Sequence, residues 1–591
     1  MHLFPRTILN RHWPALILAL FSVIVVFAQP IAGVIKSGEN YNGVWISTNG
    51  DWLYYVARIR DISLGRTGGN PYVAEHQMDL YPNIPGPETV LSWIVRATGV
   101  DPVHLEIGME FFMPIICTLL LYALLFRVSR SRAVAFVIPL ALVFLNIWML
   151  NRPIRPQINL CFTFGLLILW YGLLESLDRR DVASPLIDWF KREWKRIAAC
   201  GVLLGGLYFV YFYDWSFLWV ALACAGLVTL IARRFDMGFL NAAIGIISLP
   251  FFGAYYLLQL NVWTTPFYEE LAPRIGVIAS HLPETLPRTF VAIVACALFV
   301  ACIRSLGLLK SRAAQGMIGL LLANIAYPNT QILTGTIFQF ASHWALMPIL
   351  IYSITAAYLF PHLVAHPPSA RSARRMVWIT GTAFVAVFLV ASVRLSSYLP
   401  PPVTDAATDR FVYAQRFGPV MRFFNESTPE GSVVLAHATL SQYLPSFAHN
   451  HIYYHWYIFS LTGSDREIME RYLLSKALTP SFYDQPNLGI VDHDRPLWNV
   501  PSGMDDTTHA LHQKFGIPYE NRWTLEREQA YARTVFSELR PNGGTPTLND
   551  LKKFQLDYIV WDRKEQGGEP EMLLKLERVF DRGDIAVYRV R

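Results

Sequence analysis

The stretch PALILALFSVIVVFAQPIAGVI, from Pro14 to Ile35, is long and apolar enough to cross a lipid bilayer as a single helix. Similar runs of roughly 17–25 residues recur as far as about residue 396 and then stop. Over the whole chain 53% of the residues are apolar and only 16% are charged, whereas soluble proteins carry roughly a quarter charged residues. The sequence therefore predicts a polytopic α-helical membrane protein with about eleven transmembrane helices.

Basic residues gather in every second loop between the predicted spans, and the alternating loops are poorer in Lys and Arg. Because cytoplasmic loops carry the excess of positive charge, this pattern places the N-terminus in the cytoplasm. An odd number of crossings then places the C-terminus outside, and the short loops favour a bacterial inner (plasma) membrane. These loops also explain the net charge of +6, so no nucleic-acid partner is expected. The loop residues are Arg6, Arg11, Arg127, Arg130, Arg132, Arg179, Arg180, Lys191, Arg192, Lys195, Arg196, Arg233, Arg234, Arg304, Lys310, Arg312, Arg371, Arg374 and Arg375.

The chain divides into two regions at a proline-rich boundary. Residues 1–397 form the predicted transmembrane domain, whose long first outer loop covers residues 36–104. Pro400, Pro401 and Pro402 follow the last span, and residues 398–591 are predicted to fold as an extracytoplasmic, periplasmic α/β domain of the cell envelope. Strands are expected at 432–436, 451–457, 557–561 and 585–590, and a helix is expected at 467–478.

Cysteine and histidine patterns do not indicate a disulfide framework or a zinc site. All six cysteines lie in predicted spans, where a free thiol behaves as a small apolar residue. His449, His451 and His455 lie close together, but they lack a cysteine or a nearby carboxylate and are expected to be ordinary surface or loop histidines. No P-loop or dinucleotide fingerprint lies in a convincing context, which disfavours ATP or a nucleotide sugar as substrate.

The first outer loop contains the most informative segment, NGDWLYYVARIRD, from Asn49 to Asp61. Asn49-Gly50 is a turn signal, and helical spacing after it puts Asp51, Tyr55 and Arg58 on one face. The opposite side is apolar, so we expect an amphipathic helix that lies at the membrane surface with a carboxylate near its start. A helix N-cap is the competing interpretation of Asp51.

This arrangement resembles the GT-C superfamily of membrane glycosyltransferases, in which a long outer loop with an early acidic residue follows the first span. The resemblance rests on Asp51-x-x-Tyr54-Tyr55, on Arg58-Ile59-Arg60 and on Asn70-Pro71-Tyr72. It covers the membrane region and the outer C-terminal domain, in a layout related to oligosaccharyltransferases and protein mannosyltransferases. It implies transfer from a polyprenyl-phosphate sugar with inversion at the sugar carbon, and it assigns the catalytic acid to Asp51. The family often has two adjacent acids in this loop, whereas here Asp51 follows Asn49-Gly50.

Three further groups are candidates to bind such a substrate. Arg152 and Arg155 lie in an outer turn, against the trend of positive charge inside, and arginine makes bidentate contacts to phosphate. Contact with lipid headgroups is their alternative role. Asp214 lies between two apolar spans on the outer side, where an acid is costly unless it has a partner or faces a wet cavity. A helix cap is the alternative role of Asp214.

Two later outer segments add candidates. Glu269 lies in the loop 261–288, which is placed to cover a site, and the order of loops in oligosaccharyltransferases suggests it as a second metal ligand beside Asp51. The implied cofactor is a divalent cation, Mg²⁺ or Mn²⁺. An exposed acidic face is the alternative for Glu269. Gln331 and His343 belong to a polar stretch that either lines a cavity or packs helices together.

The leading hypothesis is therefore a glycosyltransferase that moves a sugar from a polyprenyl-phosphate donor in the membrane lipid to a glycan, lipid or protein acceptor at the outer face. A transporter or flippase of a lipid-linked glycan is one alternative, although the chain has neither internal repeats nor candidate charges at the membrane centre. A non-catalytic assembly factor whose outer domain binds a partner is another.

Overall fold

The structure is a computed structural model. It describes residues 6–47, 51–80, 84–145, 152–181, 184–283, 286–337, 346–365, 403–460, 463–479 and 482–591, apart from 484–487, 489, 491–494, 498–509, 518–522 and 542. Asn49, Gly50, His343, the proline run 400–402 and the last predicted span, about 376–397, lie outside the described residues.

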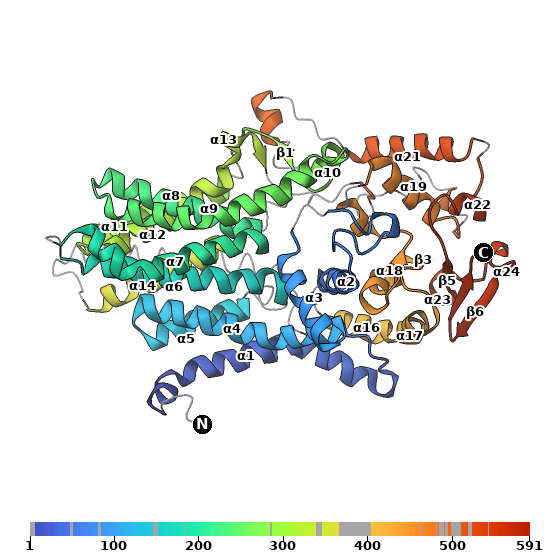
Figure 1. Ribbon diagram of the computed structural model, residues 1–591, viewed down its shortest axis with the longest axis horizontal. Coiled ribbons are helices and arrows are strands. Elements are labelled where there is room, and N and C mark those ends of the chain that lie inside the picture. The colour runs from blue at the N-terminus through green and yellow to red at the C-terminus, as the bar shows by residue number, and fades with distance from the viewer. Residues whose placement is uncertain are drawn as a thin grey trace.

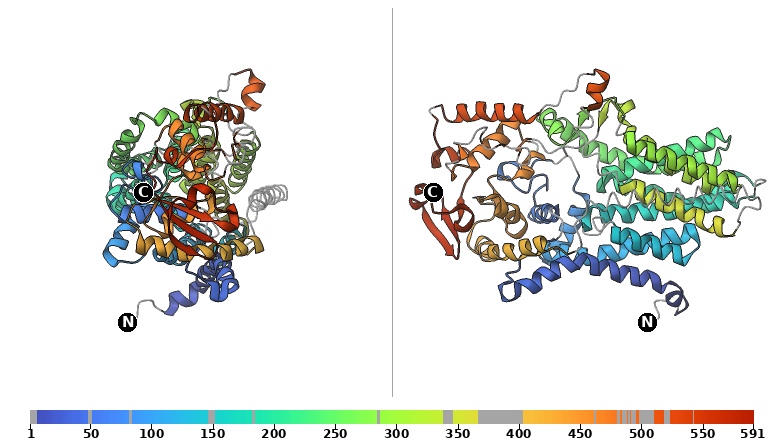
Figure 2. Two further views of the ribbon diagram at one scale, coloured as in Figure 1. Left: turned by 90° about the vertical axis from the view of Figure 1, so that its right-hand side faces the viewer. Right: turned by 180° about the vertical axis from the view of Figure 1, so that it is seen from behind.

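Long helices form one end of an elongated molecule, and a mixed α/β region forms the other (Figures 1 and 2). The long helices correspond in chain order to every predicted span except the last. Their apolar side chains form one continuous core that includes Leu125, Phe164 and Leu321. The long helices are α1 (Arg6–Ser37), α4 (Pro102–Ser129), α5 (Arg132–Leu145), α6 (Asn159–Asp178), α7 (Leu186–Val210), α8 (Phe212–Ile231), α9 (Asp236–Trp263), α11 (Leu286–Ser305), α12 (Arg312–Ala326) and α14 (Leu346–Ala365).

Within the described residues, seven helices are long and apolar enough to cross a membrane. This finding confirms a multi-pass membrane protein. The other long helices fall short for local reasons: α7 begins with a charged turn, and α12 has only 15 residues. The predicted number of about eleven spans, and their orientation, therefore stay predictions.

Short elements lie between the long helices on the side of the mixed region. Within the first outer loop, α2 (Asp51–Ser63), η2 (Ala74–His76) and α3 (Gly86–Thr98) follow η1 (Gly38–Asn40). The later connections contain η4 (Pro153–Ile158), α10 (Tyr268–Arg274), η5 (Tyr327–Asn329), α13 (Gln331–Thr334) and the antiparallel strands β1 (Ile278–Ala279) and β2 (Thr336–Ile337).

The region after residue 403 contains a five-stranded mixed sheet in the order β4-β3-β5-β7-β6. β3 (Val433–Leu435) pairs in parallel with β4 (His451–Ile452) and β5 (Tyr558–Asp562), whereas β7 (Ile585–Arg589) pairs antiparallel with β5 and β6 (Glu577–Arg582). The predicted α/β character is confirmed, but β4 is much shorter than the predicted strand 451–457 because the chain turns into η8 (Trp456–Ser460). The helices are α16 (Asp405–Ala414), η7 (Gln415–Phe417), α17 (Gly418–Ser427), α18 (Ala438–Phe447), α19 (Asp465–Ser475), α21 (Leu525–Leu539), α22 (Leu548–Leu551), α23 (Arg563–Gln566) and α24 (Glu571–Leu574).

Helix α2 lies between the two ends of the molecule, where Figure 1 shows it end-on beside α18. Its residues from Trp52 to Ile59 are all buried, so it does not lie on a membrane surface as the sequence suggested. The apolar side that a bilayer would cover is covered instead by the region after residue 403, which is called the outer region from its predicted location. Trp52 packs against Phe447, and Ser446 donates a hydrogen bond to the Leu53 carbonyl at 2.6 Å.

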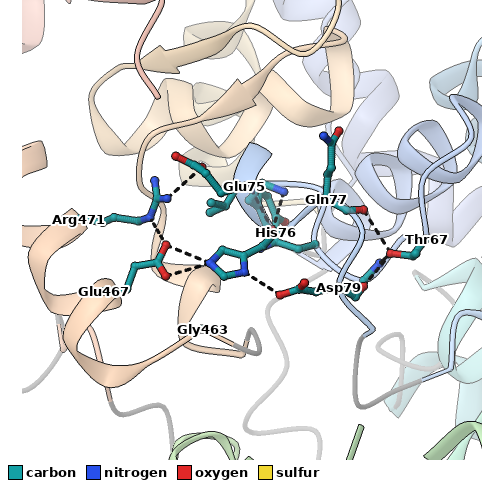
Figure 3. Close-up of polar contacts among 12 residues, drawn as sticks. Thr67, Glu75, His76, Gln77, Asp79, Gly463, Glu467 and Arg471 are labelled. Carbon is teal, nitrogen blue, oxygen red and sulfur yellow. Dashed lines mark hydrogen bonds and ion pairs between the residues drawn. The ribbon is translucent and has the colours of Figure 1, made fainter. Parts of the chain in front are cut away.

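A charged cluster joins the first outer loop to the start of α19 (Figure 3). One ring nitrogen of His76 lies 2.6 Å from Asp79, and the other lies 2.9 Å from Glu467. Arg471 pairs with Glu467 at 2.8 Å and reaches back to Glu75 at 2.9 Å. The hydrogen bonds to Asp79 and Glu467 raise the pKa of His76 to about 9. Burial raises the pKa of Glu467, but His76 and Arg471 outweigh burial and lower it to about 2. The cluster is therefore ionised near neutral pH and holds η2 against α19.

We predict that His76→Gln destabilises the protein more at pH 6 than at pH 10. The pKa of His76 is raised from 6.5 to about 9, so its charge stabilises the fold fully below pH 6.5, and this contribution is lost as the pH rises through 9. After allowance for solvent screening, the contribution is about 1–2 kcal/mol. The melting temperature in detergent, measured from pH 6 to pH 10, is expected to converge with that of the wild type at the alkaline end.

The matched control is His281→Gln, because His281 is exposed in another outer loop and, among the described residues, its ring nitrogen is hydrogen-bonded to the Ile332 carbonyl at 3.2 Å and to no charged group. Its melting temperature should follow the wild type at every pH. A loss of stability in His76→Gln that is constant from pH 6 to pH 10 would contradict the role given to the imidazolium charge.

Candidate functional site

The polar face of α2 is where the first outer loop meets the rest of the molecule. Asp51 occupies the first turn, where the helix dipole favours a carboxylate. The predicted common face of Asp51, Tyr55 and Arg58 is present: Arg152 contacts the Asp51 carboxylate and lies 3.4 Å from the Tyr55 hydroxyl. One turn further on, Arg58 pairs with Glu88 of α3 at 3.0 Å, with both side chains fully buried.

The carboxylate of Asp51 is held from two sides by distant parts of the chain. A terminal guanidinium nitrogen of Arg152, at the start of η4, donates to one oxygen. The hydroxyl of Tyr457, from η8 of the outer region, donates to the other oxygen. Burial and the nearby Asp51 charge raise the pKa of Tyr457 well above its usual range, so its hydroxyl stays a donor. The Asp51 side chain remains 36% exposed, which leaves a fixed carboxylate within reach of a substrate.

Arg155 lies on the other side of this network. It donates to the Ile84 carbonyl at 2.9 Å and lies 3.6 Å from the second oxygen of Glu88. Glu88 therefore bridges Arg58 of α2 and Arg155 of η4, and it fixes the turn that also carries Arg152. Removing either cation would leave a buried carboxylate short of a partner, which is costly.

Arg155 also lines a small, partly open pocket at the ends of α7, α8 and α9. Tyr208, Tyr211, Phe212 and Tyr255 supply aromatic walls, and the remaining lining residues are Ile84, Phe209, Val210 and Gln259. Within the described part of the chain, the Nε atom of Arg155 is buried without a hydrogen-bond partner. A guanidinium in an aromatic pocket is suited to an anionic group that offers several acceptor oxygens, such as a phosphate.

The two halves of the site meet at Tyr55 and Tyr211. Burial raises the pKa of Tyr55, and the charges that act on it are those of Arg152, Arg155, Asp51 and Glu88. Tyr211 lines the pocket, and the charges of Arg152 and Arg155 act on its hydroxyl as well. The Asp51 carboxylate and the Arg155 pocket are therefore neighbours across these tyrosines.

Other predicted site residues lie elsewhere. Asp214 is buried at the start of α8, where it accepts hydrogen bonds from Asn159 and Thr163, each at 2.8 Å, and no described contact joins it to Asp51. Gln331 is buried and donates to the Leu282 carbonyl at 3.2 Å. His343 lies outside the described residues.

The loop predicted to cover the site is attached to the outer region through α10. Arg274 donates to the Gly463 carbonyl at 2.6 Å, and Glu270 accepts a hydrogen bond from the Asp465 amide at 2.6 Å. Glu269 itself is exposed, as its alternative interpretation expected. Both this loop and the His76 cluster thus contact the start of α19.

The divalent cation expected at Asp51 and Glu269 stays a prediction, since no metal site is evident among the described residues. Nothing in the described ranges brings Glu269 to Asp51, and no group of three or more His, Cys, Asp or Glu residues there could hold a metal ion. The positive charge beside Asp51 is the guanidinium of Arg152, which opposes a second cation on the same carboxylate.

The histidines of the outer region differ from the expected surface residues. His451 and His455 are buried, and burial lowers the pKa of each to about 3, so both are neutral. Their neighbourhood is aromatic because β4 and η8 pack against the first outer loop. His455 lies 5.6 Å from Tyr72 and 5.7 Å from Tyr457, between ring centroids.

Sequence reasoning missed Glu88 and Tyr457. Glu88 lies 30 residues after Arg58 in the first outer loop, and nothing in its spacing pointed to that pairing. Tyr457 ended a run rich in aromatics, which was read as a strand. The density of aromatic residues was the available signal, since tyrosines combine packing with a hydrogen-bonding tip.

No family model matches the chain, and no curated protein matches it. Among solved structures, the chain is similar to the Archaeoglobus fulgidus oligosaccharyltransferase tethered to an acceptor peptide, with a TM-score of 0.44, 12% identity, and coverage of 94% of this chain and 70% of that chain. The oligosaccharyltransferase AglB of the same organism, in complex with an inhibitory peptide and a dolichol-phosphate, gives a TM-score of 0.45 and 13% identity, with coverage of 94% and 70%. The apo form gives 0.43 and 12%, with coverage of 93% and 69%.

Proposed function

We propose that this protein is a membrane glycosyltransferase that moves a sugar from a polyprenyl-phosphate donor to an acceptor hydroxyl at the outer face of the membrane. The observation that carries the proposal is the partly exposed carboxylate of Asp51, fixed by Arg152 and Tyr457, next to a pocket that contains Arg155. This combination supplies a proton acceptor and an anion site side by side.

The donor side of the proposal rests on the pocket at the end of α9. Tyr255 and Gln259 line the pocket, while Tyr256, Leu257 and Leu260 of the same turns are exposed large apolar residues on a membrane-spanning candidate. A lipid phosphate bound at the mouth of the pocket would therefore leave its isoprenoid chain along the apolar side of α9. Arg155 would bind the phosphate oxygens, and the surrounding tyrosine rings would exclude water and strengthen this contact.

The transfer step follows from these positions. An acceptor hydroxyl oxygen attacks the anomeric carbon of the donor sugar, and the bond from that carbon to the phosphate oxygen breaks. The bonding electron pair leaves with the phosphate, whose charge Arg155 stabilises. The proton of the hydroxyl passes to Asp51, which acts as the general base. Arg152 and Tyr457 hold the Asp51 carboxylate in orientation throughout.

The cellular setting is part of the proposal. With the N-terminus in the cytoplasm of a bacterial inner membrane, α2, the Arg155 pocket and the domain 398–591 would all lie on the extracytoplasmic side. A polyprenyl-linked sugar would serve as donor on that side, and the transfer would need no nucleotide-binding site. Residues 1–397 would then be the membrane domain, and the outer domain would complete its site with Tyr457.

We predict that Asp51→Asn lowers the transfer rate by about 10²–10⁴-fold, because an amide accepts no proton. The measurement is release and transfer of sugar by the purified protein with a panel of polyprenyl-phosphate sugars. Glu39→Gln is the matched control, since Glu39 is an exposed carboxylate of the same outer loop. Equal turnover by Asp51→Asn and the wild type would remove Asp51 from the reaction. Movement of lipid-linked sugar across vesicles, without any transfer, would favour a flippase.

We predict that Arg155→Gln raises the KM for the lipid-linked donor by about 10–100-fold, which is the usual loss for a charge-assisted contact to phosphate. The KM for the acceptor should change little, because Arg155 lies on the pocket side of the network. Steady-state kinetics with each substrate varied in turn measure both constants. Arg410→Gln, at an exposed arginine of α16, is the control. An unchanged donor KM would show that the phosphate binds elsewhere.

A further inference from the structure

The short helix η8 carries a group of aromatic rings beside the reaction carboxylate, and one of them faces outward. Trp456 is 41% exposed, whereas Phe459 is only 3% exposed and His455 only 2%. The indole of Trp456 stacks on Tyr457 with ring centroids 4.1 Å apart and planes 27° apart. Exposure of so large an apolar ring is worth explaining when its stacking partner contacts Asp51.

Among the described residues, the neighbouring aromatic rings of His455 and η8 do not cover the far face of the indole. Phe459 lies 5.9 Å from Trp456, and its plane is 11° away. If the indole lay between Tyr457 and Phe459, those two rings would be separated by nearly the sum of their distances to it. They are only 6.4 Å apart, so Phe459 lies beside the stack and not on the far side of the indole. His455, at 5.6 Å from Trp456 and 5.7 Å from Tyr457, lies beside it for the same reason.

Tyr457, which covers one face of the Trp456 indole, is itself held by further stacking contacts. Tyr457 also stacks on Tyr54 of α2, at 5.2 Å and 10°, and on Tyr72 of the first outer loop, at 5.9 Å and 8°. Tyr54 and Tyr72 are both buried. A ring braced in this way presents its open face in a fixed position relative to Asp51, and a ligand that stacks on it loses little further freedom.

We infer that Trp456 is the stacking platform for a carbohydrate acceptor, which lies with the C–H face of a sugar ring on the indole and a hydroxyl directed toward Asp51. This inference rests on the proposed function. The segment from Trp456 to Ser460 contains no charged residue, so the platform itself offers a flat, neutral, apolar face. A neutral sugar ring has such an apolar face together with the hydroxyl groups that the reaction needs.

The structure favours a sugar on this platform over the isoprenoid chain of the donor. The pocket with Arg155 is formed by the ends of α7, α8 and α9, beside exposed apolar residues of α9. Trp456 belongs to the outer region and reaches Asp51 through Tyr457, from the side opposite Arg152. The two substrates would therefore approach the carboxylate from different parts of the chain, with Trp456 setting acceptor specificity.

The experiment compares Trp456→Ala with the wild type in full-length protein in lipid nanodiscs. Steady-state kinetics are measured with a glycan acceptor and a polyprenyl-phosphate sugar, each varied in turn. The acceptor KM is expected to rise about tenfold, while the donor KM stays unchanged. Trp456→Phe should recover most of the loss because it restores a flat ring. Trp93→Ala, at a 60% exposed tryptophan of α3, is the matched control.

A binding measurement separates failure of this inference from failure of the proposed function. Saturation-transfer NMR with glucose, galactose, mannose and N-acetylglucosamine as probes needs no turnover, and signals from ring C–H protons are expected in the wild type but not in Trp456→Ala. An unchanged acceptor KM, or sugar contacts that persist in Trp456→Ala, would overturn the platform. With a polyprenyl phosphate as a further probe, loss of saturation on its isoprenoid protons in Trp456→Ala would assign Trp456 to the donor lipid and overturn the platform. Absence of donor cleavage in every variant, with sugar binding still dependent on Trp456, would overturn the transferase and leave a sugar-binding site.

Discussion

The buried ion pair between Arg58 and Glu88 constrains everything around α2. Two charged side chains with no exposure to solvent are stable only when each has a fixed partner, so α2, α3 and η4 must keep one arrangement. That arrangement places Arg152 beside Asp51 and Arg155 at the aromatic pocket. The apolar side of α2, which the sequence suggested a membrane surface would cover, is covered by the outer region instead. The candidate site is therefore built from the polar face of a helix that the rest of the molecule encloses.

The sequence identified several individual site residues but not the contacts between them. Hydropathy placed the long helices, and the 3.6-residue period correctly put Asp51, Tyr55 and Arg58 on one face. Arg152 and Arg155 were noticed because basic residues are unusual in an outer turn. The contact of Asp51 with Tyr457 joins residues 406 positions apart, and no local pattern encodes it. The same limit explains the histidines: His451 and His455 are polar by type, and only the packing of β4 and η8 against the first loop shows that they are buried.

The positive charge at Asp51 comes from the chain itself. A divalent ion was expected there because the order of loops in oligosaccharyltransferases suggested Glu269 as a second ligand, whereas Glu269 is exposed on α10 and Arg152 faces Asp51. A guanidinium is a fixed donor with a directed hydrogen bond, whereas a metal ion attracts several ligands at once. The site consequently depends on the position of η4, and Glu88 fixes this position through its ion pair with Arg155.

The place of Tyr457 in the chain has a consequence for biosynthesis. Ribosomes make the chain from its N-terminus, so α2, η4 and the walls of the Arg155 pocket are inserted before η8 is translated. Until the outer region folds onto α2, Asp51 lacks its phenol donor and the rings behind Trp456 are not stacked. An unfinished or truncated copy that lacks η8 would therefore lack the hydrogen bond from Tyr457 to Asp51 and the stack of Trp456 on Tyr457.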